Sequence, residues 1–287
     1  MKKRILLLGL VVLMVLTGCG TTEKETKTKE KDPDKLVLNI EDKKEDNIQE
    51  EQTDMQEQAS QPDGQSQAEE AKEQQTQKNG HLIAIDAGHQ AKGNSEKEPV
   101  GPGSSEMKAK CTSGTQGTYS GVPEYQLNLE VSLQLKDELE QRGYQVVMTR
   151  TDNETAISNM ERAQYAAAQG AEIYVRIHAN GDDSHTASGA LTMSPSQNNP
   201  YIPQLFEQSD RLSRCIIDSY CAATGFQNLG IQYTDTMTGI NWSTVPVTIL
   251  EMGFMTSQND DLKMNDTEFQ KTMVQGIANG IDSYFAS

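Results

Sequence analysis

The feature that most constrains this chain is an alternation, from His81 onward, of short apolar runs with longer helical patterns. Strand-length runs are expected at residues 82–85, 144–148, 173–177, 189–193 and 246–250. Helical patterns are expected at residues 123–143, 157–169, 204–224 and 269–285. Alternating strands and helices are typical of a parallel sheet with helical crossovers. We therefore predict a single α/β domain over residues 81–287, with a mostly parallel sheet flanked by helices on both faces.

The first residues have the pattern of an export signal. Three basic residues at positions 2–4 precede an apolar stretch, residues 5–16, that is short for a membrane-spanning helix. The sequence Leu-Thr-Gly-Cys at residues 16–19 then resembles a bacterial lipobox, in which the cysteine carries a lipid. We predict a signal peptide at residues 1–18, lipidation of Cys19, and a lipid anchor in the membrane. An ordinary secretory signal with an incidental cysteine is the alternative.

Residues 20–80 are polar and acidic. They contain seventeen acidic and nine basic residues and no aromatic residue, so their net charge is −8. Such a segment cannot bury enough apolar surface to offset the entropy of ordering it. We therefore predict that residues 19–80 are a disordered linker that begins at the lipidated cysteine. A coil of this length spans about 40–50 Å as a root-mean-square distance, which suits a tether between a membrane and something some distance away.

The whole chain is acidic, with a net charge of −17. A nucleic-acid-binding protein usually presents a basic face, so we expect no nucleic-acid partner. The charge favours solubility and disfavours non-specific binding to polyanions.

The cysteines do not suggest a disulfide scaffold. If Cys19 carries lipid, then Cys111, Cys215 and Cys221 remain, which is an odd number for an exported protein. Cys215 and Cys221 are six residues apart in an expected helix and lie on different faces of it. We predict no disulfide between them.

Four residues that can bind a metal or move a proton stand beside the expected strands. His89 follows the first strand, His178 ends the third, and Glu251 ends the last long apolar run. Glu124 lies in the first turn of the helix that follows a long loop. In an open parallel sheet the carboxyl ends of the strands share one edge, where ligands bind. We therefore expect these four side chains to converge.

Two neutral imidazoles and one carboxylate form a usual ligand set for catalytic zinc. We predict that His89, Glu124 and His178 bind Zn²⁺ and that Glu251 is the general base and acid. Simpler interpretations exist: a histidine at a strand end is often merely hydrogen-bonded, and Glu124 could simply stabilise a helix N-terminus. Spacing alone leaves Glu124 open. Glu251 is the most unusual acid, because a carboxylate at an apolar strand end is costly unless it has a partner or a function.

Five short motifs follow one another on the expected elements. They are Ile85-Asp86-Ala87-Gly88-His89, Gly121-Val122-Pro123-Glu124 with Leu127-Asn128-Leu129, Val147-Met148-Thr149-Arg150, Ile177-His178-Ala179-Asn180, and Glu251-Met252-Gly253-Phe254 with Thr256 and Asn259. Together they resemble the zinc-dependent N-acetylmuramoyl-L-alanine amidases of bacterial cell-wall turnover, from His81 to the C-terminus. The resemblance implies hydrolysis of the amide between N-acetylmuramic acid and L-alanine in peptidoglycan. It also implies that Glu124 is the carboxylate ligand.

The chain departs from this family in several places. Ala87 stands where the family usually has proline, and Gln90 where glycine often follows the histidine. The loop before Glu124 is longer than the common form, and it contains three further carboxylates that could take the place of this ligand: Glu96, Glu98 and Glu106. We prefer Glu124, because the start of a helix fixes a ligand better than a loop does.

Two further residues near the third strand are expected to contact substrate. Arg176 stands where the family often has serine, and we predict that it binds a substrate carboxylate in bidentate fashion, with Asn180 as a second contact. A salt bridge at the strand edge is an equal alternative for Arg176. Cys111, in the long loop, could reach the metal as an inhibitory ligand, although an inert thiol is the preferred interpretation.

The competing functional hypothesis is a non-catalytic cell-wall-binding or regulatory lipoprotein on the same fold. It is disfavoured because all four chemical positions are filled. A solute-binding lipoprotein usually needs two lobes around a cleft, and one domain after a long tether fits this poorly. We therefore expect an extracytoplasmic peptidoglycan hydrolase that is anchored by lipid and acts as a monomer.

Overall fold

The computed structural model describes residues 79–287. The predicted signal peptide, Cys19 and nearly all of the predicted linker lie outside the described residues. Within the described part of the chain, no helix combines the length and apolar character needed to cross a membrane.

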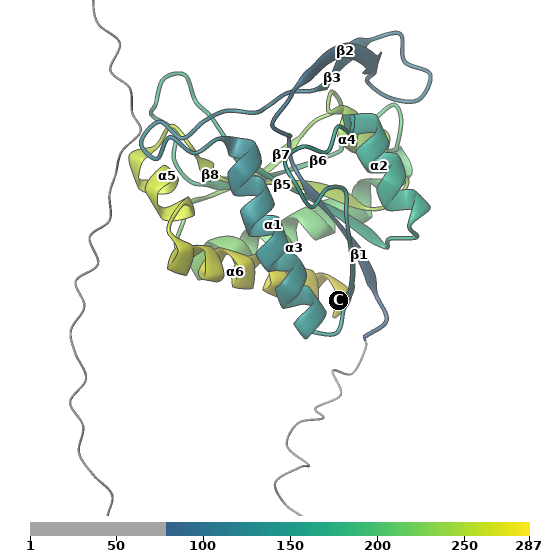
Figure 1. Ribbon diagram of the computed structural model, residues 1–287. Coiled ribbons are helices and arrows are strands. Elements are labelled where there is room, and N and C mark those ends of the chain that lie inside the picture. Colours follow the sequence, from purple (N-terminus) through teal and green to yellow (C-terminus); the bar gives the residue numbers. More distant parts are fainter. Residues whose placement is uncertain (1–78) are drawn as a thin grey trace, which may run out of the picture. The chain divides into compact units, whose positions relative to one another are not determined.

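A six-stranded sheet forms the centre of the domain, with the strand order β4-β1-β5-β8-β6-β7 (Figure 1). Its first four strands run parallel: β4 (Gln145–Met148), β1 (Leu82–Ala87), β5 (Ile173–Asn180) and β8 (Val247–Phe254). The other two run the opposite way, because β6 is antiparallel to β8 and parallel to β7: β6 (Ala190–Ser194) and β7 (Asn228–Tyr233). The predicted α/β class with a mostly parallel sheet is confirmed.

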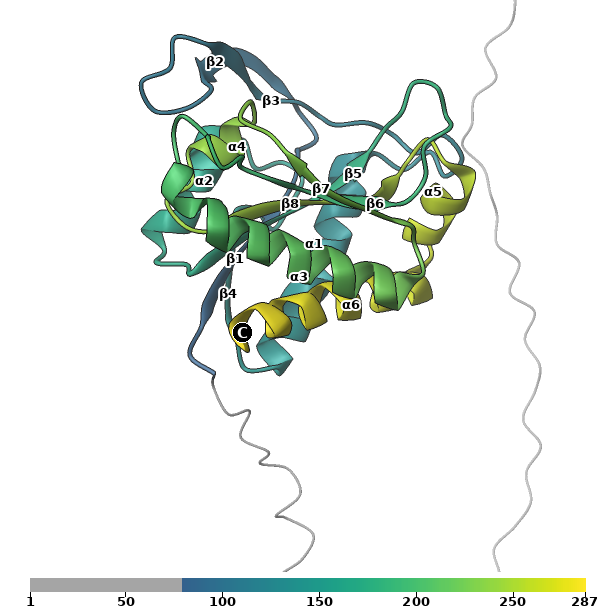
Figure 2. The same cartoon turned by 180° about the vertical axis from the view of Figure 1, so that it is seen from behind.

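Helices cover both faces of the sheet (Figures 1 and 2). One face packs against the three long helices: α1 (Glu124–Gln141), α3 (Phe206–Thr224) and α6 (Thr267–Phe285). The other face packs against two shorter ones: α2 (Asn159–Ala168) and α4 (Thr238–Asn241). The remaining helical pieces are short: η1 (Pro203–Leu205) and α5 (Gln258–Met264).

Side chains of the central strands alternate between these two layers. In β1, Ile83 and Ile85 belong to the core beside α1 and α6, whereas Ala84 belongs to the core beside α2. The same period of two applies to β5 and β8. It places His178 and Glu251, which are paired in register on these neighbouring strands, on the face that α2 covers.

The start of α2 is fixed by a capping box. The Ser158 hydroxyl accepts a hydrogen bond from the Glu161 backbone N–H at 3.2 Å, and the Glu161 carboxylate accepts one from the Ser158 N–H at 2.8 Å. These two bonds satisfy donors that a helix N-terminus leaves free. They also fix the first turn of the helix that carries Arg162.

The long loop between His89 and Glu124 contains a hairpin that the sequence pattern did not predict. Its strands are antiparallel: β2 (Asn94–Pro99) and β3 (Met107–Cys111). The hairpin is attached to the α4 region, where the Trp242 indole N–H donates to the Pro99 carbonyl at 2.9 Å and the Asn241 amide donates to the Val100 carbonyl at 3.0 Å. The strand β7 and the helices α4 and α5 were not predicted either.

The three cysteines of the described domain are all free thiols: Cys111, Cys215 and Cys221. The prediction that Cys215 and Cys221 form no disulfide is therefore confirmed.

Candidate metal centre

Three side chains from distant parts of the sequence meet at the carboxyl-end edge of the sheet. His89 lies two residues after β1, Glu124 is the first residue of α1, and His178 lies within β5. One ligand atom of each lies within 4.8 Å of the others. The structure thus brings together the three residues that the sequence predicted as metal ligands.

Glu124 lies between the two imidazoles. Its Oε1 is 3.1 Å from Nε2 of His89 and 3.3 Å from Nδ1 of His178. The two rings stand nearly perpendicular, with centroids 4.8 Å apart. The His89 side chain is 19% exposed, against 11% for His178 and 5% for Glu124, so the cluster opens to solvent on the His89 side.

Backbone and amide donors hold the Glu124 carboxylate in place. It accepts hydrogen bonds from the Thr115 N–H at 2.9 Å, the Ala179 N–H at 3.2 Å and the Asn128 side-chain amide at 3.2 Å. Burial alone would raise the pKa of Glu124, but hydrogen bonds and charges from His178 and His89 outweigh it and hold the pKa well below its usual range. The group is therefore a carboxylate, which is the form that binds a cation.

The His178 ring is in the form that binds a metal. Burial lowers the pKa of His178 to about 4, so its imidazole is neutral at physiological pH. Its Nε2 is buried and has no hydrogen-bond partner, although buried polar atoms are almost always paired. Gly88 packs against this ring so closely that a Cβ at that position would overlap it. A neutral imidazole, a carboxylate and an unpaired ring nitrogen fit the ligand chemistry of Zn²⁺.

The second imidazole is oriented from the loop. Nδ1 of His89 lies 3.0 Å from both the carbonyl oxygen and the hydroxyl oxygen of Thr112. A ring nitrogen that donates to a carbonyl leaves the other nitrogen as an acceptor, which is how metal-binding histidines are usually held. In His89 the remaining nitrogen, Nε2, is the one that faces Glu124.

Glu251 lies beside the cluster on the neighbouring strand. It is a half-buried residue inside β8 and pairs in register with His178 of β5. Burial and the negative charge of Glu124 raise the pKa of Glu251 to about 8, against the opposing effect of Arg176. A carboxyl group whose pKa lies near neutrality can both take and return a proton. Glu251 and His178 lie inside their strands, three residues before the end of β8 and two before the end of β5, instead of at the strand ends.

Arg176 occupies the salt bridge that the sequence left as its alternative. It is only 3% exposed; its Nε donates to Asp86 at 2.8 Å and its Nη2 donates to Asn159 at 2.9 Å. A guanidinium that is buried and bonded in this way is not presented to a substrate. Asn180 ends β5, and its side-chain oxygen accepts a hydrogen bond from the Gly181 N–H at 2.8 Å.

The alternative carboxylates of the long loop stay out of the cluster. Glu96 pairs with Lys110 at 2.8 Å, Glu98 accepts a hydrogen bond from the Met160 N–H at 3.0 Å, and Glu106 is exposed. Cys111 is buried, its thiol donates to the Thr112 carbonyl at 3.3 Å, and burial raises its pKa. It is not among the clustered ligand atoms, which agrees with an inert thiol.

Sequence reasoning missed the residues that orient the ligands. Asn128 is fully buried one helical turn after Glu124, and its spacing of four residues was a usable signal for contact along the helix face. Thr112 and Thr115 lie in the loop, where neither period nor composition pointed to them.

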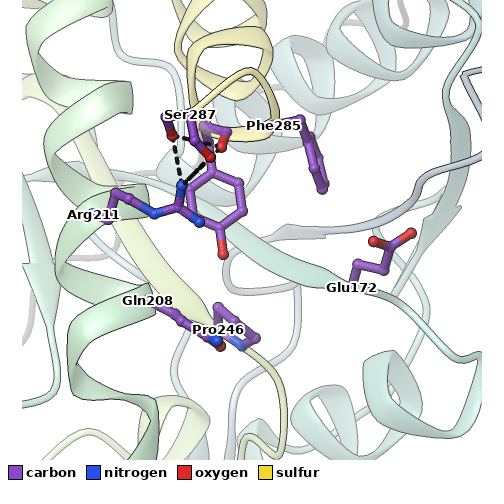
Figure 3. A pocket seen from close by; sticks show the side chains of 7 residues that line it. Glu172, Gln208, Arg211, Pro246, Phe285 and Ser287 are labelled. Atoms are coloured by element: carbon purple, nitrogen blue, oxygen red, sulfur yellow. Dashed lines mark hydrogen bonds between the residues drawn. The ribbon is translucent and has the colours of Figure 1, made fainter.

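A separate cavity of about 350 Å³ is lined by residues near the amino ends of two parallel strands, and Figure 3 shows the side chains of its walls. Its walls include Glu172, just before β5, and Pro246, just before β8. Arg211 lies over the Tyr284 ring at 4.2 Å and donates to the Ser287 carbonyl at 2.9 Å. Because these walls stand at the amino ends of parallel strands, the cavity is remote from the clustered ligands.

Comparison with known proteins gives consistent relatives. A protein family described as N-acetylmuramoyl-L-alanine amidase matches residues 83–283. The uncharacterized protein YqiI of Bacillus subtilis is 29% identical over 206 residues, which cover 72% of this chain and 85% of YqiI. The N-acetylmuramoyl-L-alanine amidase LytC of the same organism is 27% identical over 168 residues, which cover 58% of this chain and 32% of LytC.

Solved structures share the fold. The catalytic domain of CwlV, an N-acetylmuramoyl-L-alanine amidase from Bacillus (Paenibacillus) polymyxa var. colistinus, is 26% identical with a TM-score of 0.57, over 72% of this chain and 98% of that one. Ami1 of Mycobacterium smegmatis has a TM-score of 0.66 at 24% identity, over 72% of this chain and 97% of that one. The matched family spans all of the sheet except its first residue, Leu82, and includes the clustered ligands. The chain belongs to the N-acetylmuramoyl-L-alanine amidase family.

Proposed function

We propose that this chain is a zinc-dependent hydrolase that cleaves the amide bond between N-acetylmuramic acid and the L-alanine of the peptidoglycan stem peptide. Membership of the amidase family supports the reaction. The observation that carries the zinc assignment is the convergence of two imidazoles and one carboxylate, with one ligand atom of each within 4.8 Å of the others, beside the buried and unpartnered Nε2 of His178. A site built only for structure would pair that nitrogen.

The residues divide the chemistry among them. His89, Glu124 and His178 would hold Zn²⁺, which when bound makes water more acidic and polarises the amide carbonyl. Glu251 takes a proton from the attacking water on its carboxylate, as the water oxygen bonds to the carbonyl carbon. The same carboxyl group returns the proton to the leaving nitrogen as the C–N bond breaks. The products are a muramic acid carboxylate and a stem peptide that begins with free L-alanine.

The proposed location follows from the N-terminal pattern. Lipidation of Cys19 would anchor the chain in the membrane, and the acidic segment at residues 20–80 would let the domain reach the wall. Replacing Cys19 by alanine should move the protein from the membrane fraction to the medium. Retention in the membrane fraction by the variant would contradict a lipid anchor at this residue.

The catalytic assignment is tested with Glu251→Gln. The purified protein should contain about one zinc per chain, and mass analysis of peptidoglycan digests should show free stem peptides that begin with L-alanine. The variant should keep its zinc and its fold but lose amide cleavage by at least ~100-fold, because the amide side chain cannot accept the proton. The control is Glu106→Gln, the same change at an exposed glutamate of the hairpin loop.

The outcomes separate the hypotheses. A folded wild-type protein without zinc would reject the metal site. Undiminished cleavage by Glu251→Gln would remove this residue from its role. Peptidoglycan binding without any released stem peptide would favour the alternative of a non-catalytic wall-binding protein.

A further inference from the structure

Three successive backbone carbonyls at the metal centre are bound by side chains. They belong to Ala87, Gly88 and His89, where the chain leaves β1 and turns. Arg150 donates to the Ala87 carbonyl at 2.8 Å and to the Gly88 carbonyl at 3.0 Å. Arg162 donates to the Ala87 carbonyl at 2.8 Å and to the His89 carbonyl at 2.9 Å. These carbonyls are therefore held from outside the segment.

A third donor links this segment to another ligand. The Asn128 side-chain amide donates to the Gly88 carbonyl at 3.3 Å and to the Glu124 carboxylate at 3.2 Å. Asn128 lies on α1, Arg162 on α2, and Arg150 just after β4. Three separate elements thus converge on the backbone that carries His89.

The segment needs such support because of its backbone conformation. His89 has φ of 61°, in the left-handed region that residues other than glycine rarely adopt. A strained conformation at a functional site persists only when the surrounding structure determines it. If the carbonyls were released, the backbone could relax and turn the His89 ring away from Glu124.

Arg150 has no other evident use. It is 2% exposed and forms no ion pair with a carboxylate among residues 79–287. Its hydrogen bonds all go to carbonyl-type oxygens, including that of Tyr125 at 2.7 Å. A buried cation is costly unless its donors are used, and these donors join the start of α1 to the turn that carries His89.

We propose that Asn128, Arg150 and Arg162 form a carbonyl clamp, a set of positioning residues that fixes His89 and thereby sets the affinity of the centre for zinc. This inference rests on the proposed zinc function. The clamp residues contact neither the metal nor the substrate and act only through the ligands that they hold. Outer groups that orient metal ligands typically change metal affinity by about 10–100-fold when they are removed.

Lysine substitutions distinguish the loss of the hydrogen bonds to the carbonyls from the loss of positive charge and of side-chain packing. A lysine keeps the positive charge but carries one nitrogen, so it cannot bridge two carbonyls as a guanidinium does. Arg150→Lys and Arg162→Lys should each weaken zinc binding by about 10–100-fold. The matched control is Arg176→Lys, since Arg176 shares the Asp86 partner of Arg162 but donates to none of the three carbonyls.

The experiment measures the zinc dissociation constant of each purified full-length variant by competition with a chelator, beside the melting temperature of the metal-free protein. Weakened zinc binding in the two clamp variants but not in Arg176→Lys supports the inference. Equal zinc affinity in all four proteins overturns it, whatever their melting temperatures, because a purely structural role lowers stability alone. If neither arginine variant folds, Asn128→Ala takes their place under the same criterion.

Failure of this inference is distinguishable from failure of the proposed function. A wild-type protein that is folded and binds no zinc defeats both. A wild-type protein that binds zinc and releases stem peptides, with clamp variants of unchanged zinc affinity, defeats only the clamp.

Discussion

Two clusters of polar and charged side chains lie beside each other at one end of the sheet, and they differ in whether their polar groups are paired. The ion network consists of Asp86, Arg162 and Arg176, and its side chains are at most 4% exposed. Asp86 bonds Arg162 at 2.7 Å, Arg176 at 2.8 Å and the Thr149 hydroxyl, so its charge is fully paired. The metal centre instead holds a buried ring nitrogen without a partner.

The difference shows what each cluster is for. Burial raises the pKa of Asp86, but the two guanidinium groups and the Thr149 hydrogen bond outweigh it and hold the pKa well below its usual range. The one carboxylate of the ion network is paired with two guanidinium groups within the protein, which suits a structural role. The metal centre places two lone-pair donors around one carboxylate, and an added cation would complete it. We therefore expect the Asp86 ion pairs to govern stability and the metal centre to govern chemistry, with Arg162 contributing to both through its separate bonds to Asp86 and to the Ala87 and His89 carbonyls.

An isosteric change in each cluster tests this difference most directly and should give the largest effect. Asp86→Asn removes the charge that pairs two buried arginines, so it should lower the free energy of unfolding by about 3–5 kcal/mol. Glu124→Gln keeps an oxygen for only part of the surrounding donors, since Thr115 bonds Oε2 whereas Asn128 and Ala179 bond Oε1, and it loses the carboxylate charge. It should abolish tight zinc binding while lowering the stability of the metal-free protein by about 1–3 kcal/mol, because no buried cation loses its partner.

Urea unfolding of the metal-free proteins and zinc content check this pair of outcomes. The control is Asp183→Asn, the same change at an exposed aspartate. Because the pKa of folded Asp86 is depressed, its contribution is present above the unfolded pKa and should be lost as the pH falls below about 4. Comparable losses of stability in Asp86→Asn and Glu124→Gln would show that the two clusters do not differ in the way we infer.

The same contrast explains which parts of the site the sequence could predict. The parallel sheet, with its ligands at the carboxyl edge, follows from strand order, so His89 and His178 could be placed together from the pattern alone. Glu124 needed the family resemblance, because a carboxylate at a helix start has a simpler explanation. For Arg176 the sequence left a substrate contact and a salt bridge as equal alternatives, since nothing in a single sequence reveals that Asp86, ninety residues earlier, lies on the adjacent strand and pairs with it.

The unpredicted elements have a common physical cause. The hairpin strand β2 reads Asn-Ser-Glu-Lys-Glu-Pro, which lacks the apolar alternation of a half-buried strand. Its stability comes from tertiary contacts. Asn241 and Trp242 donate hydrogen bonds to the backbone carbonyls at its C-terminal end. The buried Glu98 accepts a hydrogen bond from the backbone at the start of α2. Local patterns cannot register contacts of that kind, and strand preference depends strongly on context.

Glu251 tests the comparison with a smaller expected effect, because it is neither paired with a cation, as Asp86 is, nor one of the proposed metal ligands. It has no ion pair among the described residues, and its pKa of about 8 lies above the ordinary value of 4.5. In the metal-free protein the folded state therefore keeps a proton that the unfolded state loses. The stability of the folded state should fall as the pH rises from about 4.5 to about 8. Glu251→Gln removes this penalty, so the metal-free variant should be about 1–3 kcal/mol more stable than the wild type above pH 8, and equal to it below about pH 4.5.

Urea unfolding in the presence of a chelator, at about pH 4 and about pH 9, measures this difference directly, with Glu106→Gln as the exposed control. Zinc should cancel the effect, since a nearby cation favours the carboxylate form of Glu251. The variant would then lose its advantage over the wild type when both proteins carry the metal. An advantage that is the same at both pH values would mean that the gain comes from packing and not from the proton. Glu251 would then lie in an environment closer to that of the paired carboxylate of Asp86 than to that of a general base.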